Sequence, residues 1–228
     1  MEYLILAIII LIIVIILKCI FEYKLKNLKE LGKDEELDKL ADKYPENIDM
    51  CKSYLKMLNN DSVEIEENKD SETSLYIAIT NKISIANVRN TYTRIQTIAH
   101  ECLHSVQDRK LLMFNFWFSN VYLLYFLIIS ILEIFNVLPY KNIFLIILIL
   151  LSFVYYMVRA FLENDAMIKA KFLAKEYMEN MKISTKEEIE KIVSGFDKIN
   201  NKGIKCINYN LFLGCMIKIL IFLILCIF

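Results

Sequence analysis

The residues best suited to chemistry in this chain lie together in one short segment, His100-Glu101-Cys102-Leu103-His104. The chain has two histidines, and both lie in this segment, four positions apart. On a helix, such positions are one turn apart on the same face, so both imidazoles can bind one metal ion. Glu101, beside the first histidine, is placed to accept a proton from a water molecule at that metal. This H-E-x-x-H pattern predicts one Zn²⁺ per chain, with His100 and His104 as ligands and Glu101 as the catalytic base.

Long apolar blocks flank this segment. Of the 228 residues, 57% are hydrophobic, whereas roughly 45–50% is usual for soluble proteins. The blocks predict transmembrane helices at 1–21, on either side of a short turn within 111–158, and at 206–228, because about 20 apolar residues cross a bilayer. Positive residues near spans mark the cytoplasmic side, and here they are Lys18, Lys24, Lys26, Lys29, Lys198, Lys202 and Lys205. We therefore expect an integral membrane protein with both termini outside and the motif in the cytoplasm.

The third metal ligand must come from another part of the chain. A catalytic zinc ion usually has three protein ligands, and no third histidine exists, so a carboxylate or a cysteine must complete the set. A transmembrane hairpin at 111–158 returns the chain to the side of the motif. The first acidic residues after it are Glu163 and Asp165. We expect Glu163 to be the ligand and keep Asp165 as the alternative.

The polar segments 22–110 and 159–205 are expected to form the cytoplasmic part, the second being helical. Within the first, apolar periodicity predicts helices and short strands ahead of a metal helix. The expected elements are helices over 24–43 and 47–58, strands over 63–66, 75–79 and 83–86, and the metal helix over 90–108. The predicted fold is mainly α, with four transmembrane helices and a small α+β cytoplasmic domain.

The strand just before the metal helix has a predicted role in binding. Its residues are Ile83, Ser84, Ile85 and Ala86. As an edge strand it could pair with an extended peptide through main-chain hydrogen bonds. The alternative is a strand that only covers the metal helix.

The charge balance and the cysteines indicate which partners and which compartment to expect. Lys+Arg and Asp+Glu number 27 each, and no basic stripe with interleaved aromatic residues occurs, so nucleic acid is not a predicted partner. The six cysteines show no C-x-x-C spacing and are expected to be small buried hydrophobes in a reducing compartment. The oligomeric state stays open.

Several further side chains could contribute. Contacts to the substrate could come from Tyr76, Arg89, Arg94 or Arg159, and the sequence does not choose among them. Lys218 lies within the last apolar block, where a charge is costly, so it should face other helices. Glu133 is a candidate partner for it.

The motif and its surroundings resemble the bacterial neutral zinc membrane metallopeptidases. Those proteins carry H-E-x-x-H-x-x-Q on a helix behind a short strand, then a glutamate in an E-x-x-A context after transmembrane segments. The matching residues are His100, Glu101, His104 and Gln107, then Glu163 and Ala166. More distantly, the chain is similar to the glutamate-zincin membrane proteases, including the prenyl-protein endopeptidases. The resemblance implies a zincin-like cytoplasmic domain, a bacterial plasma membrane location, and supporting roles for Gln107 and Asp165 beside the ligands.

Two positions depart from the family pattern. Leu103 stands where the family usually has glycine, before the second histidine. Met167 stands where the wider glutamate-zincin pattern has an aspartate that would support a ligand histidine.

The predicted function is that of a zinc metalloendopeptidase that hydrolyses membrane-associated polypeptides at the cytoplasmic face. The alternative is a catalytically inactive zinc-binding membrane scaffold or partner-binding subunit. The presence of Glu101 favours the enzyme, since a purely structural site needs no base. A transporter or channel is disfavoured, because the four apolar blocks contain very few charges.

Overall fold

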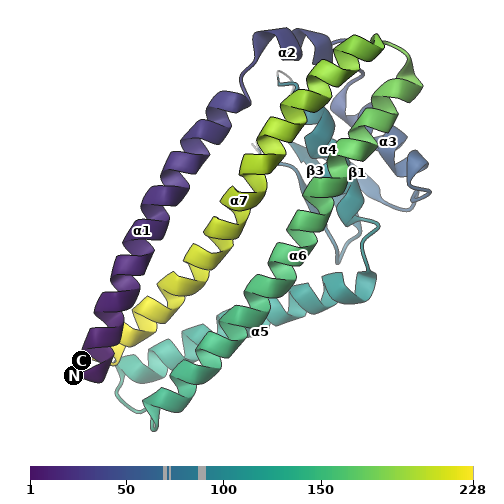
Figure 1. The fold of residues 1–228 in the computed structure, drawn as a ribbon. Helices are drawn as coiled ribbons and strands as arrows, with labels where there is room; N and C mark the ends of the chain where they lie inside the picture. The colour runs from purple at the N-terminus through teal and green to yellow at the C-terminus, as the bar shows by residue number, and fades with distance from the viewer. Residues whose placement is uncertain (69–70, 72, 87–90, 228) are drawn as a thin grey trace. The chain divides into compact units, whose positions relative to one another are not determined.

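The computed structural model describes residues 1–68, 71, 73–86 and 91–227. The described part of the chain is mainly helical with one small sheet, as the composition and periodicity predict (Figure 1). In chain order the elements are α1 (Glu2–Leu31), α2 (Glu35–Ala41), α3 (Asn47–Met57), β1 (Glu64–Asn68), β2 (Leu75–Ile77), β3 (Lys82–Ala86), α4 (Thr93–His104), α5 (Arg109–Ile134), α6 (Lys141–Met181) and α7 (Lys186–Leu225).

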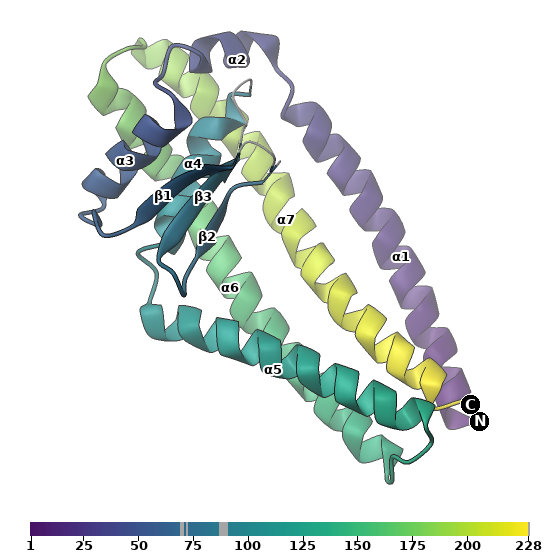
Figure 2. The ribbon, with the colours of Figure 1, turned by 180° about the vertical axis from the view of Figure 1, so that it is seen from behind.

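The chain divides into two compact units, each assembled from separate segments. Unit 1 consists of Met1–Leu25, Phe114–Phe161 and Lys205–Phe228. Unit 2 consists of Lys26–Met113 and Leu162–Ile204. The start of α1 and the end of α7 lie side by side in unit 1 (Figures 1 and 2).

Unit 1 is built from the apolar parts of four helices, α1, α5, α6 and α7, each long and apolar enough to cross a membrane. Its core packs residues such as Tyr122, Leu148 and Phe222. Lys141 forms an ion pair with the buried Glu133. Lys218 instead lies over the ring of Tyr122, with its ammonium 5.1 Å from the ring centroid. The expected pairing of Lys218 with Glu133 is therefore wrong, because Glu133 binds the lysine that opens α6.

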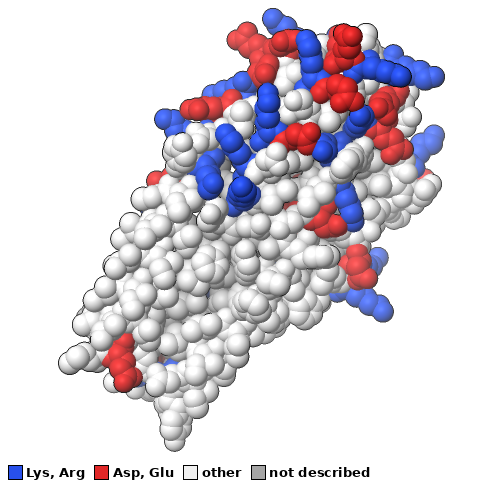
Figure 3. Space-filling view, in the orientation of Figure 1, with Lys and Arg blue, Asp and Glu red and all other residues white. Residues whose placement is uncertain are grey.

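Unit 2 carries most of the charge. On the face shown in Figure 3, acidic and basic side chains gather over the elements of unit 2, and the surface of unit 1 is almost free of them. Its core is a cluster of buried side chains from the sheet and from helices α2, α3, α4, α6 and α7.

The charged helix expected over 24–43 is broken in the structure. Helix α1 ends at Leu31 and α2 begins at Glu35. The Asp34 carboxylate caps α2 by accepting hydrogen bonds from the N–H groups of Glu36 and Leu37, each at 3.1 Å. Asp is a preferred N-cap residue because it satisfies N–H groups that have no partner within the helix. Residues 47–57 form a helix as predicted.

The sheet has the strand order β1-β3-β2 (Figure 2). Strand β3 pairs with β1 in parallel, with Ile83 opposite Ile65, and with β2 antiparallel, with Ile83 opposite Tyr76. The prediction that Ile83, Ser84, Ile85 and Ala86 form a substrate-binding edge strand is therefore wrong. Both sides of β3 are already hydrogen-bonded, so this strand covers the core, and its Ile83 and Ile85 are fully buried.

Candidate metal centre

Helix α4 presents the histidines because its opposite face is apolar. Ile95, Ile98, Ala99 and Cys102 are almost completely buried, and they recur at spacings of three and four residues. This periodicity fixes the rotation of a helix against a core. Helix α4 packs on α3 and on strands β2 and β3, which leaves the histidines half-buried on the remaining side. Leu103 packs in the same core at 8% exposure.

Helix α6 brings Glu163 to the histidines. Ala166, Ala170 and Ala174 repeat every fourth residue and are fully buried, so one face of α6 is small enough to lie close to the core. Glu163 is three residues before Ala166 and lies on that same face. Both α4 and this part of α6 belong to unit 2. Unit 2 therefore contains the complete set of residues described below.

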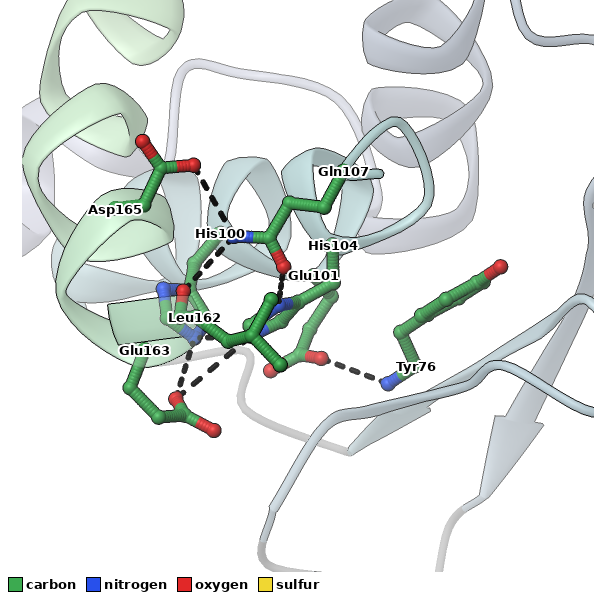
Figure 4. Close-up of polar contacts among 8 residues, drawn as sticks. All are labelled: Tyr76, His100, Glu101, His104, Gln107, Leu162, Glu163 and Asp165. Carbon is green, nitrogen blue, oxygen red and sulfur yellow. Dashed lines mark hydrogen bonds and ion pairs between the residues drawn. The ribbon is translucent and has the colours of Figure 1, made fainter. Parts of the chain in front are cut away.

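Three ligand atoms converge between these two helices (Figure 4). His104 Nε2 lies 3.0 Å from His100 Nε2, and Glu163 Oε2 lies 3.4 Å from His100 Nε2 and 3.7 Å from His104 Nε2. A tetrahedral zinc ion with bonds of about 2.0–2.1 Å needs ligand atoms roughly 3.3 Å apart. The three atoms fit such an ion with little adjustment, and the three side chains keep 12–16% of their surface exposed.

Glu101 points from α4 toward strand β2. Its carboxylate Oε2 accepts a hydrogen bond of 2.7 Å from the main-chain N–H of Tyr76. The side chain is buried, with 7% of the residue exposed. Burial raises the pKa of Glu101 and outweighs the neighbouring imidazoles and the Tyr76 N–H, which lower it. A carboxylate with a raised pKa beside two candidate metal ligands is placed to accept and return a proton.

His104 is held on both of its ring nitrogens. Nε2 faces the other ligands, and Nδ1 lies 2.8 Å from Oε1 of Gln107. Burial lowers the pKa of His104, but the interactions with Glu163, Glu101 and Gln107 together outweigh burial, and the pKa is raised above its ordinary value.

Asp165, the alternative ligand, lies outside the triad. Its Oδ2 accepts a hydrogen bond of 3.1 Å from Gln107 Nε2, and its Oδ1 pairs with Lys169 at 2.6 Å. The same amide nitrogen donates to the main-chain carbonyl of Leu162 at 2.8 Å. The structure therefore places Gln107 and Asp165 behind His104, and places Glu163 with the histidines.

Two of the proposed substrate contacts, Tyr76 and Arg94, have their side chains bonded to other groups in the structure. The Tyr76 hydroxyl donates to Asn81, and its ring points away from Glu101 (Figure 4). The Arg94 guanidinium is 5% exposed and donates to the carbonyls of residues 41, 44 and 45 and to the Asn47 side chain, so it organises a loop. Arg89 lies outside the described residues, and Arg159 belongs to unit 1.

Two main-chain groups at the site were not anticipated, namely the N–H of Tyr76 and the carbonyl of Leu162. Main-chain groups leave no mark in residue type, so only the fold could reveal them. The thioether of Met167 has no carboxylate to offer a histidine, and the Met167 carbonyl accepts a hydrogen bond of 3.2 Å from Asn200.

Comparisons of this chain with models of protein families, with curated proteins and with solved structures find no match.

Proposed function

We propose that this protein is a membrane zinc metalloendopeptidase. The observation that carries the proposal is the convergence of His100, His104 and Glu163 on one point, with Glu101 on the turn between the two histidines. A structural zinc site uses four protein ligands and needs no base. Three ligands with an adjacent buried carboxylate are the arrangement of a hydrolytic site. The same residues carry the resemblance to the neutral zinc membrane metallopeptidases.

The chain's own residues divide the work of hydrolysis. The triad would hold Zn²⁺, which lowers the pKa of water and polarises a carbonyl group when bound. Glu101 would accept the proton of the attacking water and pass it to the leaving amine. The hydrogen bond from the Tyr76 N–H holds the Glu101 carboxylate between α4 and strand β2.

A membrane setting is supported by the direction in which the apolar residues face. In the most apolar stretch of α1 only 6% of the residues are buried within the protein, and in α5 and α6 only 22% and 17%. A soluble protein rarely exposes so large a contiguous apolar surface, whereas a bilayer would cover it. The lysines next to the first and last apolar blocks favour a cytoplasmic site, so membrane-associated polypeptides are the proposed substrates.

Strand β2 replaces β3 as the proposed strand for substrate pairing. In the part of the chain that the structure describes, β2 pairs on one side only. Its Tyr76 N–H points away from β3 to the catalytic glutamate. An extended peptide that paired along this side of β2 would lie next to Glu101.

The deciding experiment combines metal analysis with a test of proteolysis. Purified wild-type protein and a Glu101→Gln variant are assayed for bound zinc and for cleavage of an unstructured protein substrate. Both should hold one zinc ion per chain, and the variant should lose roughly 10²- to 10⁴-fold in rate, the usual contribution of a general base. The matched control is Glu176→Gln, which removes an exposed carboxylate from α6 and should leave both values unchanged.

Two outcomes would redirect the proposal. Wild-type protein that binds no zinc would refute the metal site. Zinc at one equivalent without cleavage of any substrate, in both wild type and variant, would favour the inactive scaffold.

A further inference from the structure

The hydrogen bonds around Gln107 determine which nitrogen of His104 carries the proton. The Gln107 side chain contacts three groups: the Leu162 carbonyl, the Asp165 carboxylate and Nδ1 of His104. The carbonyl oxygen of Leu162 can only accept a hydrogen bond. The Asp165 carboxylate is ionised by its pairing with Lys169 at 2.6 Å and also only accepts.

These two acceptors fix the orientation of the amide group. The nitrogen of an amide donates and its oxygen accepts, so the nitrogen must face Leu162 and Asp165. The reverse orientation would place the amide oxygen against two other acceptors, at 2.8 and 3.1 Å, and leave both contacts repulsive. The oxygen must therefore face His104.

The orientation of the amide in turn fixes the imidazole. Because Gln107 Oε1 can only accept, the His104 Nδ1 at 2.8 Å must donate and must carry hydrogen. In the neutral ring the lone pair is then on Nε2, the nitrogen that faces His100 and Glu163. Free histidine carries its proton on either nitrogen, so this preference is imposed by the surroundings.

We propose that Gln107 is a positioning residue that locks His104 in the Nδ1–H tautomer, with Asp165 and the Leu162 carbonyl holding the Gln107 amide in place. The tautomer follows from the hydrogen bonds alone. Only its role, which is to present the Nε2 lone pair of His104 to zinc, rests on the proposed function. The Asp165 charge polarises the amide and makes its oxygen a better acceptor. A hydrogen-bond partner behind a metal-binding histidine usually sets the tautomer of that histidine.

The tautomer can be measured directly because the chain has two histidines. The full-length protein, labelled with ¹⁵N-histidine and solubilised in detergent, is free of metal and kept at about pH 9, above the ordinary histidine pKa of about 6.5. Long-range ¹H–¹⁵N correlations then distinguish Nδ1–H from Nε2–H in each ring, and a His100→Asn variant assigns the two signals. We expect wild-type His104 in the Nδ1–H form.

Three variants test the cause. Gln107→Leu keeps the volume but removes the acceptor, so His104 should change to a mixture rich in the Nε2–H form. Its zinc affinity, measured by competition with a chelator, should fall roughly 10- to 100-fold. Asp165→Asn leaves the Leu162 contact, so the tautomer should persist with a smaller loss of affinity. Gln96→Leu is the matched control, since Gln96 is a buried glutamine of α4 that bonds Asn200 instead, and it should leave the His104 tautomer unchanged.

The inference is overturned if wild-type His104 is in the Nε2–H form, if Gln107→Leu keeps the wild-type tautomer, or if Gln96→Leu changes it equally. These results do not depend on catalysis. A protein with the Nδ1–H tautomer and no peptidase activity would support this inference and refute the proposed function.

Discussion

The two histidines of the triad differ in what a metal ion has to displace. If Nε2 of His104 holds a lone pair, its contact of 3.0 Å with Nε2 of His100 requires a proton on the His100 nitrogen. Zinc can bind this nitrogen only after the proton has moved to Nδ1 of His100 or left the ring, because only deprotonated imidazole nitrogens coordinate metals. A neutral His100 therefore has to change its tautomer when zinc binds, whereas His104 already presents a free Nε2.

Protonation of His104 predicts the pH dependence of zinc binding. Burial lowers the pKa of His104, but its interactions with Glu163, Glu101 and Gln107 together outweigh burial and raise the pKa above its ordinary value. Protons therefore compete with zinc at low pH, and the affinity should rise with pH until the solution is above this raised pKa. Chelator competition over a series of pH values measures this. An affinity that stays constant between about pH 6 and 8 would contradict it, since that interval includes the ordinary titration range of histidine.

Removing Glu163 should distinguish the third ligand from its neighbour. Glu163→Ala takes away one of three converging atoms, so zinc affinity should fall by more than the roughly 10- to 100-fold typical of losing an outer partner. Asp165→Ala, two residues away, should stay within that range. The comparison is made by chelator competition on both variants. Full affinity in Glu163→Ala with a large loss in Asp165→Ala would reverse the assignment.

At this scale the sequence predicted residue types better than contacts. The spacing of His100 and His104 and the place of Glu163 after the hairpin were sufficient to predict three residues that the structure brings together. The role of Arg94 was not predictable, because residue type does not distinguish an arginine that binds substrate from a buried one bonded to four groups between Ala41 and Asn47.

Among the elements, α7 makes a contact that tolerates no added side-chain atom. A Cβ on Gly195 would lie 2.8 Å from both Leu37 Cδ1 and Tyr92 Cε2. The Leu37 methyl can move, but the Tyr92 ring is stacked on Phe196 and its hydroxyl is bonded to the carbonyl of Leu31. The ring directly precedes α4, so a displaced Tyr92 would also disturb the start of the metal helix.

Gly195→Ala should therefore destabilise the protein by about 1–3 kcal/mol, the usual range for overpacking. Gly214→Ala is the matched control on the same helix. A Cβ there meets no atom within 4 Å, so the better helix propensity of alanine should leave stability unchanged or raise it by up to about 1 kcal/mol. Thermal unfolding of the detergent-solubilised variants gives the comparison, and equal shifts would contradict the packing argument.

The strands show what periodicity leaves undetermined. Alternation located all three strands to within a few residues, but pairing order is a property of contacts distant in sequence. Strand β3 is central because β1 pairs with it in parallel, across the β2 segment that intervenes in the chain. The break between α1 and α2 is not visible in the periodicity, because leucines recur at helical spacing on both sides of Gly32 and of the cap at Asp34.

At the scale of the whole molecule, unit 1 has the exposed apolar surface and unit 2 has most of the charged side chains. This separation predicts that the protein stays with membranes after washing with alkaline carbonate, which releases peripheral proteins but not helices that span the bilayer. Sedimentation of washed membranes followed by immunoblotting checks this. Appearance of the protein in the soluble fraction would contradict the proposed spans.

The orientation can be tested separately. With an even number of spans and lysines beside the polar segments, reporters fused to either terminus should both report the outside. A reporter inserted at Lys182, in the polar turn between α6 and α7, should report the cytoplasm. A cytoplasmic signal from the C-terminus would refute the proposed topology.

The discontinuous make-up of unit 2 has a consequence for biosynthesis. Its first segment ends at Met113, and its second begins at Leu162, so His100 and His104 leave the ribosome well before Glu163 is translated. A nascent chain at that stage has two of the three ligands and none of the α6 partners that orient Gln107. Under the proposed function, the protein can hydrolyse peptides only after both helices of the hairpin have been synthesised. The nascent chain therefore cannot cleave the translocation machinery while it is being inserted.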